Sequence, residues 1–197
     1  MIHTVVGLMF LSIIYSIRLR SKTGMIYINT KTGHSYLVND IHRREQAAEL
    51  LDALYLKLDE LINCFDTKTL EYIVSTKQYS ELGVTELQGY LNRLKKRFQG
   101  VKIEENSKLK PELDLTSYSV NKGDKLVFCI RKPNDPIEFV DLNTLTYVAL
   151  HEITHIACPE IGHTELFHKI FKFITLTAIE YKVYSYQDYE SNPKAYC

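Results

Sequence analysis

The chain has 197 residues and a formal net charge of zero, with 24 basic and 24 acidic side chains. This length suits one domain with a hydrophobic core of its own, plus short additional segments. The balanced charge speaks against bulk electrostatic attraction to nucleic acid, and no nucleic-acid partner is expected. The four cysteines form no C-x-x-C pair, and a chain of this size does not depend on disulfides, so reduced thiols are expected.

Residues 1–23 are predicted to form a membrane anchor with a basic flank. Residues 5–17 are almost wholly apolar, and Arg18, Arg20 and Lys22 follow them. A cleaved signal peptide would carry its positive charge before the apolar run. The run is at or just below the ~17–25 residues of a spanning helix. Its flank predicts a single-pass protein with the C-terminal domain on the cytoplasmic side of a host or virion inner membrane, the alternative being a buried or interfacial helix.

Residues 24–197 are predicted to form one α+β domain. Two strand-like stretches around a glycine-containing loop predict a β-hairpin over residues 25–38. Asp40 is a candidate cap for a long amphipathic helix that runs to about Phe65. Its apolar residues recur at steps of three and four, which is typical of a helix that packs one face on a core.

Two further helices are expected over about residues 67–78 and 85–98, and residues 102–111 are predicted to be a connection with little strand character. Residues 116–130 predict a second hairpin, with its turn at residues 121–124. Its second strand is continuously apolar and is expected to be buried. This hairpin is the candidate for a strand beside an active-site cleft, where a substrate backbone could pair with the strand edge.

The motif HEITH, from His151 to His155, lies in a stretch predicted to be helical and capped by Asp141 or Asn143. Residues i and i+4 of a helix share one face, so both imidazoles can reach one metal ion. Glu152 flanks that ion without having to bind it. This is the position from which a general base takes a proton from a metal-bound water.

The rest of this helix supports a metal site rather than two ordinary helical histidines. One apolar stripe recurs at steps of three and four and consists of Leu142, Leu145, Ala149, Ile153 and Ile156. The two histidines and the glutamate lie on a separate row, whereas a core histidine would more naturally lie on the apolar stripe. The pattern therefore favours a zinc site.

A third ligand is expected just after this helix. A turn is predicted at residues 159–162, and because the chain reverses there, His163 can return to the ion before the next helix begins. Glu165 is the rival, as in sites with two histidines and one glutamate, while His168 and Cys158 are less favoured. Three protein ligands and one open position indicate a catalytic rather than a structural zinc site.

A family resemblance is carried by TSYSVNKGDKLVFCI (residues 116–130), NTLTYVALHEITHIACPEIGHTELFHKIFKF (residues 143–173) and the tail DYESNPKAYC (residues 188–197). These stretches resemble the zinc metallopeptidases predicted for large double-stranded DNA viruses. That family is similar to the WLM and SprT-like peptidases, whose G-H-x-x-x-F signature matches GHTELF, residues 162–167. The resemblance implies a zincin-like fold, helices packed on a small antiparallel sheet, and Zn2+ as cofactor. It implies that the metal ligands are His151, His155 and His163 and that the general base is Glu152.

The expected function is membrane-anchored, zinc-dependent hydrolysis of peptide bonds by a zinc-activated water. An oxyanion-stabilising donor is also expected, with Tyr118, Tyr147 and Tyr181 as candidates. The expected partners are a protein or peptide substrate, the membrane, and viral capsid or membrane proteins. The alternative function is a zinc-stabilised structural or minor virion membrane protein that keeps the peptidase fold without turnover. A nucleic-acid-linked protease is disfavoured by the neutral charge.

Overall fold

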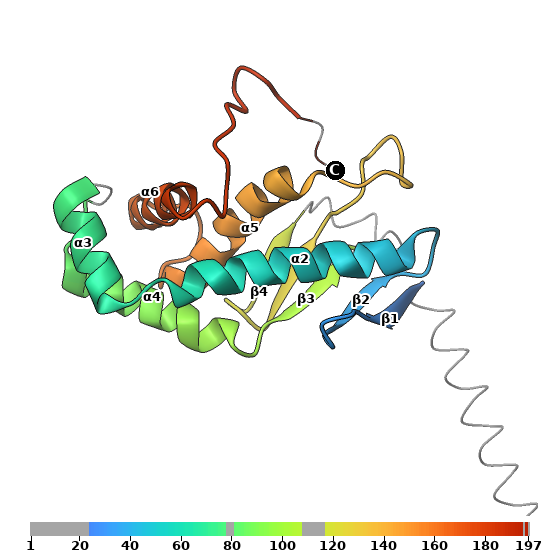
Figure 1. Cartoon of the computed structure of the whole chain (residues 1–197), viewed down its shortest axis with the longest axis horizontal. Helices are drawn as coiled ribbons and strands as arrows, with labels where there is room; N and C mark the ends of the chain where they lie inside the picture. The colour runs from blue at the N-terminus through green and yellow to red at the C-terminus, as the bar shows by residue number, and fades with distance from the viewer. Residues whose placement is uncertain (1–23, 78–80, 108–116, 195, 197) are drawn as a thin grey trace, which may run out of the picture.

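The computed structural model describes residues 24–77, 81–107, 117–194 and 196, which form the α+β fold shown in Figure 1. The strands are β1 (Met25–Asn29), β2 (Ser35–Asn39), β3 (Lys102–Glu105), β4 (Tyr118–Val120) and β5 (Lys125–Phe128). The helices are α2 (Arg44–Asn63), α3 (Thr67–Lys77), α4 (Val84–Phe98), α5 (Leu142–Ala157) and α6 (Glu165–Glu180). Both predicted hairpins and the five helices predicted within residues 24–197 are confirmed in type and approximate position.

The sheet is mixed rather than antiparallel. Its strand order is β1-β2-β3-β5-β4. The two hairpins, β1–β2 and β4–β5, are antiparallel, but β3 lies between them and runs parallel to both β2 and β5. The prediction of a small antiparallel sheet is therefore wrong at its centre. In this order β4 is an edge strand, next to a strand that is buried as predicted.

Strand β3 was predicted to be a connection because its sequence, KIEE, has no hydrophobic alternation. Its charges are compensated by neighbouring elements. Glu104 pairs with Lys125 at 2.7 Å, and Glu105 pairs with Arg131 at 2.7 Å with both side chains only 2% exposed. Glu105 also accepts a hydrogen bond from the Asn39 backbone N–H. Tertiary ion pairs thus allow a charged segment to sit in the middle of the sheet.

Helix α5 is central to the packing and contacts α2, α4, α6 and β4. In Figure 1, α2 runs along the middle of the molecule, α3, α4 and α6 gather at one end, and the β1–β2 hairpin lies at the other. The predicted apolar faces form the core. In α5 the fully buried aliphatic side chains include Leu145, Ala149, Leu150, Ile153 and Ile156. Burial of one such leucine or isoleucine contributes about 1.5–3 kcal/mol.

The turn of the β4–β5 hairpin is fixed against the C-terminal end of α5. Gly123 has φ +118°, and a Cβ there would come within 3.2 Å of the Ile156 side chain, so a side chain would be strained and crowded. The Lys122 ammonium donates hydrogen bonds to the carbonyl oxygens of Cys158 and Pro159, both at 2.8 Å. A cation at the carbonyl end of a helix is favourable. These contacts hold the hairpin beside α5.

Two predictions from the sequence, the membrane location and the reduced state of all cysteines, disagree with the structure. The predicted membrane anchor, residues 1–23, lies outside them, and none of the helices in the described part of the chain is long and apolar enough to cross a bilayer. This finding contradicts the predicted single-pass membrane location. The expectation that all cysteines are reduced is also wrong, because Cys129 is disulfide-bonded, whereas Cys64 and Cys158 are free thiols.

Candidate metal centre

The helix that carries the HEITH motif begins at a well-defined cap. Asp141 is the N-cap of α5, and its carboxylate accepts hydrogen bonds from the Thr144 backbone N–H at 2.9 Å and from the Thr144 hydroxyl at 2.8 Å. The other candidate, Asn143, instead exchanges two hydrogen bonds with the backbone of Ser185. The cap fixes where the helix starts, and hence which of its residues face the sheet edge and which face α6.

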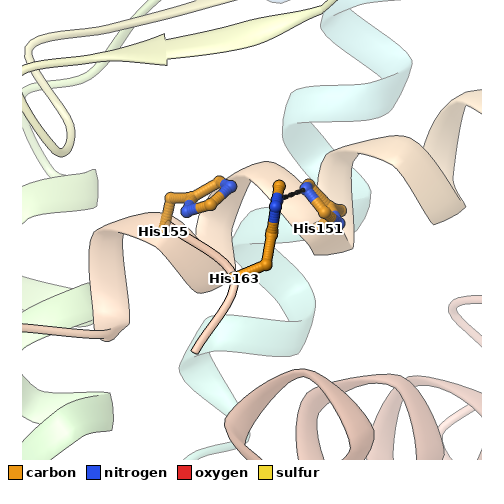
Figure 2. A group of neighbouring side chains, drawn as sticks. All are labelled: His151, His155 and His163. Carbon is orange, nitrogen blue, oxygen red and sulfur yellow. Dashed lines mark hydrogen bonds between the residues drawn. The ribbon is translucent and has the colours of Figure 1, made fainter. Parts of the chain in front are cut away.

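Three histidines converge at the C-terminal half of this helix. Figure 2 shows His151 and His155 on α5, with His163 reaching toward them from the loop before α6. Their candidate ligand atoms all lie within 4.8 Å of one another, and the Nε2 atoms of His163 and His151 are 2.9 Å apart. Zinc–nitrogen bonds of 2.0–2.1 Å in a tetrahedral site give ligand separations of about 3.3 Å. Small side-chain rotations would equalise the observed separations to that value, so the three rings fit a zinc ion.

A buried phenylalanine holds the three rings together. Phe167 is 1% exposed, and its ring centroid lies 4.4 Å from that of His155, 5.0 Å from His151 and 4.9 Å from His163. It is placed by the first turn of α6, where the N-cap hydroxyl of Thr164 accepts a hydrogen bond from the Phe167 backbone N–H. The G-H-x-x-x-F spacing therefore has a structural reason, since it places the phenylalanine ring against the histidine cluster.

The surroundings favour the neutral form of the helical histidines. Burial, followed by the neighbouring imidazoles, lowers the pKa of His151 to about 4 and that of His155 to about 4. A neutral imidazole has a lone pair for a metal, whereas a protonated one has none. Both rings are therefore ready to bind a metal ion at neutral pH without first losing a proton.

Glu152 lies on the side of α5 that faces the sheet edge. It is 6% exposed, and its carboxylate accepts a hydrogen bond from the backbone N–H of Ser119, the middle residue of β4. Burial raises the pKa of Glu152 to about 7, against the opposing effect of that hydrogen bond. A carboxyl group with a pKa in this range can both accept and release a proton near neutral pH.

The rival ligands lie outside this cluster. Glu165 is exposed, and its carboxylate pairs with Lys169 at 2.7 Å. The His168 ring centroid is 6.5 Å from that of His163, and Cys158 is a buried residue at the C-terminal end of α5. Among the residues that the structure describes, one group of histidine, cysteine or acidic side chains could hold a metal ion. It consists of the three histidines.

No protein-family model matches the chain. The chain is 31% identical over 187 residues to Uncharacterized protein R325 of Acanthamoeba polyphaga mimivirus. The aligned region covers 94% of this chain and 87% of that protein. The chain belongs to the family of this mimivirus protein. A viral family was expected from the resemblance of its motifs, whereas the peptidase activity that the same motifs imply stays a prediction.

Two solved structures show a partial and distant likeness. Wss1 from Saccharomyces cerevisiae is 20% identical, with 50% of this chain and 80% of that one covered and a TM-score of 0.35. A Wss1 mutant is 18% identical, with 50% and 81% covered and a TM-score of 0.34. TM-scores at this level do not establish a common fold.

Tyr196 of this chain lies close to Glu152, although the sequence analysis did not single it out. Burial, with a smaller contribution from the Glu152 carboxylate, raises the pKa of Tyr196 to about 12, although a hydrogen bond with Ser117 acts in the opposite direction. The predicted candidate Tyr147 instead packs in an aromatic cluster, with its ring 5.1 Å from that of Tyr189. The resemblance of the tail to the family was the available signal for Tyr196, but nothing local indicated where that tail would lie.

Proposed function

We propose that this chain is a zinc-dependent peptidase that hydrolyses peptide bonds in a protein or peptide substrate. The observation that carries this proposal is the convergence of three histidines, two from α5 and one from the loop before α6, beside a buried glutamate of α5 that lies next to a sheet edge. Structural zinc sites are usually closed by four protein ligands, whereas hydrolytic sites use three. The three-histidine set of this chain therefore favours a hydrolytic site.

The metal suits both the ligand set and the reaction. Nitrogen ligands from three imidazoles are typical of zinc, and the separations of His151, His155 and His163 accommodate it. When bound, a zinc ion supplies Lewis-acid activation of water near neutral pH. His163 is exposed, so the histidine cluster can be approached from solvent.

Glu152 is assigned the role of general base and then general acid. Its carboxylate takes a proton from the attacking water and delivers it to the leaving amine. Two features of its environment support this assignment, namely a pKa raised to about 7 and an interaction of its carboxylate with the Ser119 N–H. Because Glu152 and His151 are adjacent in α5 and face different neighbours, the base lies beside the metal site without occupying it.

The edge strand is assigned the role of substrate platform. Among the described strands, β4 pairs with β5 on one side and ends the sheet on the other. An extended peptide can add to such an edge by backbone hydrogen bonds, which gives affinity with little dependence on sequence. Since Ser119 of β4 also contacts Glu152, a peptide bound along β4 would run past the general base.

The test compares three proteins: the wild type, Glu152→Gln and His151→Ala. Zinc content is measured by mass spectrometry, and cleavage is profiled on a proteome-derived peptide library. We expect one zinc per chain and cleavage for the wild type, one zinc without cleavage for Glu152→Gln, and neither for His151→Ala. If Glu152→Gln equals the wild type in cleavage as well as in zinc content, the chain uses its metal to hold the fold and the peptidase proposal fails.

A further inference from the structure

The segment after α6, residues 181–194 and 196, returns along α5 and is called the tail below. Ser185 donates a backbone hydrogen bond to Asn143 at 2.9 Å and accepts one from the same side chain at 2.8 Å. Further along, the Lys194 ammonium pairs with Asp141 at 2.9 Å. Figure 1 shows this path, with the tail leaving α6 and looping back past the first turns of α5. The tail is thus held against the first turn of α5, and its Tyr196 reaches the start of β4.

Tyr196 joins the start of the edge strand. Its hydroxyl forms a hydrogen bond with the hydroxyl of Ser117, the residue immediately before β4. The same Ser117 oxygen accepts a hydrogen bond from the Cys129 backbone N–H at 3.0 Å. Ser117 is therefore held from two sides, by the tail and by the residue that follows β5. Because loss of a hydrogen-bond partner is unfavourable for a part-buried hydroxyl, these contacts constrain the backbone at residue 117.

The constraint continues to the proposed general base. Strand β4 has three residues and is hydrogen-bonded only to β5 among the described strands, with Ser119 opposite Leu126. Ser119 lies two residues after Ser117 and donates its backbone N–H to the Glu152 carboxylate. A short edge strand frays easily unless its ends are held. The position of the Ser119 N–H therefore depends on how firmly Ser117 is held.

We infer that Tyr196 is a positioning residue for Glu152, acting through Ser117 and strand β4. This inference rests on the proposed peptidase function and adds the tail to its active site. The tail keeps the edge strand in register so that one backbone N–H fixes the carboxylate in its working orientation. Displacement of such a group by even 1 Å is costly to catalysis.

The contacts of the histidines distinguish this role from that of a blocking strap. The three histidines make ring contacts with one another. Among the other described aromatic residues, they make ring contacts with Phe167, Phe171 and His168. Tyr196 is not among them, and the carboxylate that acts on it electrostatically is Glu152. Tyr196 therefore borders the base and makes no ring contact with the three histidines.

The test uses hydroxyl deletions on both sides of the contact. The variants are Tyr196→Phe, Ser117→Ala and their combination, with Ser117→Thr as the conservative variant that keeps a hydroxyl. Tyr186→Phe is the matched control, because Tyr186 lies on the same tail and is 72% exposed. Circular dichroism melting checks that each variant is folded before any other measurement, and Ser117→Ala carries the test if Tyr196→Phe does not fold.

The first readout needs no metal and no substrate. Hydrogen exchange of the Ser119 amide, followed by NMR, should be about 3- to 10-fold faster in Tyr196→Phe and in Ser117→Ala, as expected for loss of one supporting hydrogen bond. Ser117→Thr and Tyr186→Phe should exchange at the wild-type rate. Wild-type exchange in both hydroxyl deletions would overturn the inference.

The second readout is steady-state cleavage by the zinc-loaded protein. We expect kcat to fall by about 3- to 10-fold in each hydroxyl deletion with KM within about twofold, and the combined variant to be no worse than either, because both remove one shared interaction. Faster cleavage in Tyr196→Phe would identify a blocking tail and overturn the inference. The failure of the peptidase proposal is recognised separately, since Glu152→Gln would then equal the wild type whatever the amide exchange shows.

Discussion

The Nε2 atoms of His163 and His151 lie 2.9 Å apart although the two residues are twelve positions apart in sequence. The third histidine therefore belongs to the same cluster as the two of the helix, which Glu165 does not join. We predict that His163→Ala weakens zinc binding by more than the roughly 10–100-fold typical of losing an outer-shell partner. Competition titration against a zinc chelator measures this change.

Glu165→Ala serves as the control for that experiment and should bind zinc as the wild type does. A second measurement follows from mass action, because a ligand that binds only the native state stabilises it by about 2.7 kcal/mol at 100 times its Kd. Added zinc should therefore raise the melting temperature of the wild type and of Glu165→Ala, but not that of His163→Ala. Retained zinc in His163→Ala together with its loss in Glu165→Ala would reverse the assignment.

The buried ion pair between Glu105 and Arg131 predicts a large stability effect. Removal of one partner leaves an uncompensated buried charge, which typically costs about 3–5 kcal/mol. We expect Arg131→Met to lower the free energy of unfolding in urea by that amount. The control is Lys132→Met, which removes an exposed pair with Glu138 and should change stability little. A loss below about 1 kcal/mol in Arg131→Met would mean that β3 is not held in the sheet by this pair.

The cap of α5 predicts a smaller effect. Asp141→Ala removes the acceptor for the Thr144 backbone N–H and should lower the free energy of unfolding by about 1 kcal/mol. Asp141→Asn keeps a capping oxygen while it removes the charge that faces Lys194, so it should retain most of the stability. Thermal melting followed by circular dichroism compares the two. Equal losses in both variants would assign the effect to the ion pair with Lys194 instead of the cap.

Acid sensitivity is predicted for the buried carboxylate of Asp52. Burial opposes its ionisation, but hydrogen bonds from His34, Thr32 and Tyr36 outweigh burial and lower the pKa of Asp52. A lowered folded pKa means that the unfolded chain binds the proton first. The stabilisation is therefore complete above the unfolded value of about 3.9 and is lost as the pH falls through the folded pKa.

The measurement is the free energy of unfolding in urea between about pH 6 and pH 2.5. In the wild type it should fall steeply below about pH 4, and in Asp52→Asn this part of the fall should be missing. Glu60→Gln, at an exposed position of the same helix, is the control and should follow the wild-type curve. A curve for Asp52→Asn that parallels the wild type throughout would show that the hydrogen bonds to Asp52 do not contribute.

Local patterns in the sequence were enough to predict the helices and hairpins. Steps of three and four in the apolar residues predicted the helices, and their core-facing side chains in α2, such as Leu51, Leu54 and Leu58, are fully buried. The turn at residues 121–124 and the i, i+4 spacing of His151 and His155 were equally readable. All of these depend on backbone geometry and on hydrogen bonds between residues close in sequence, so a short window contains the whole cause.

The order of the strands in the sheet and the path of the tail depend on contacts between distant segments. The charged strand β3 enters the sheet because Arg131 and Lys125 compensate its carboxylates, and this makes the sheet mixed rather than antiparallel. The placement of Tyr196 beside Glu152 depends on a tail that returns along α5 over more than forty positions of sequence separation. Such partners are chosen by packing and by the need to satisfy buried charge and hydrogen bonds, and no local pattern records which distant segment will supply them.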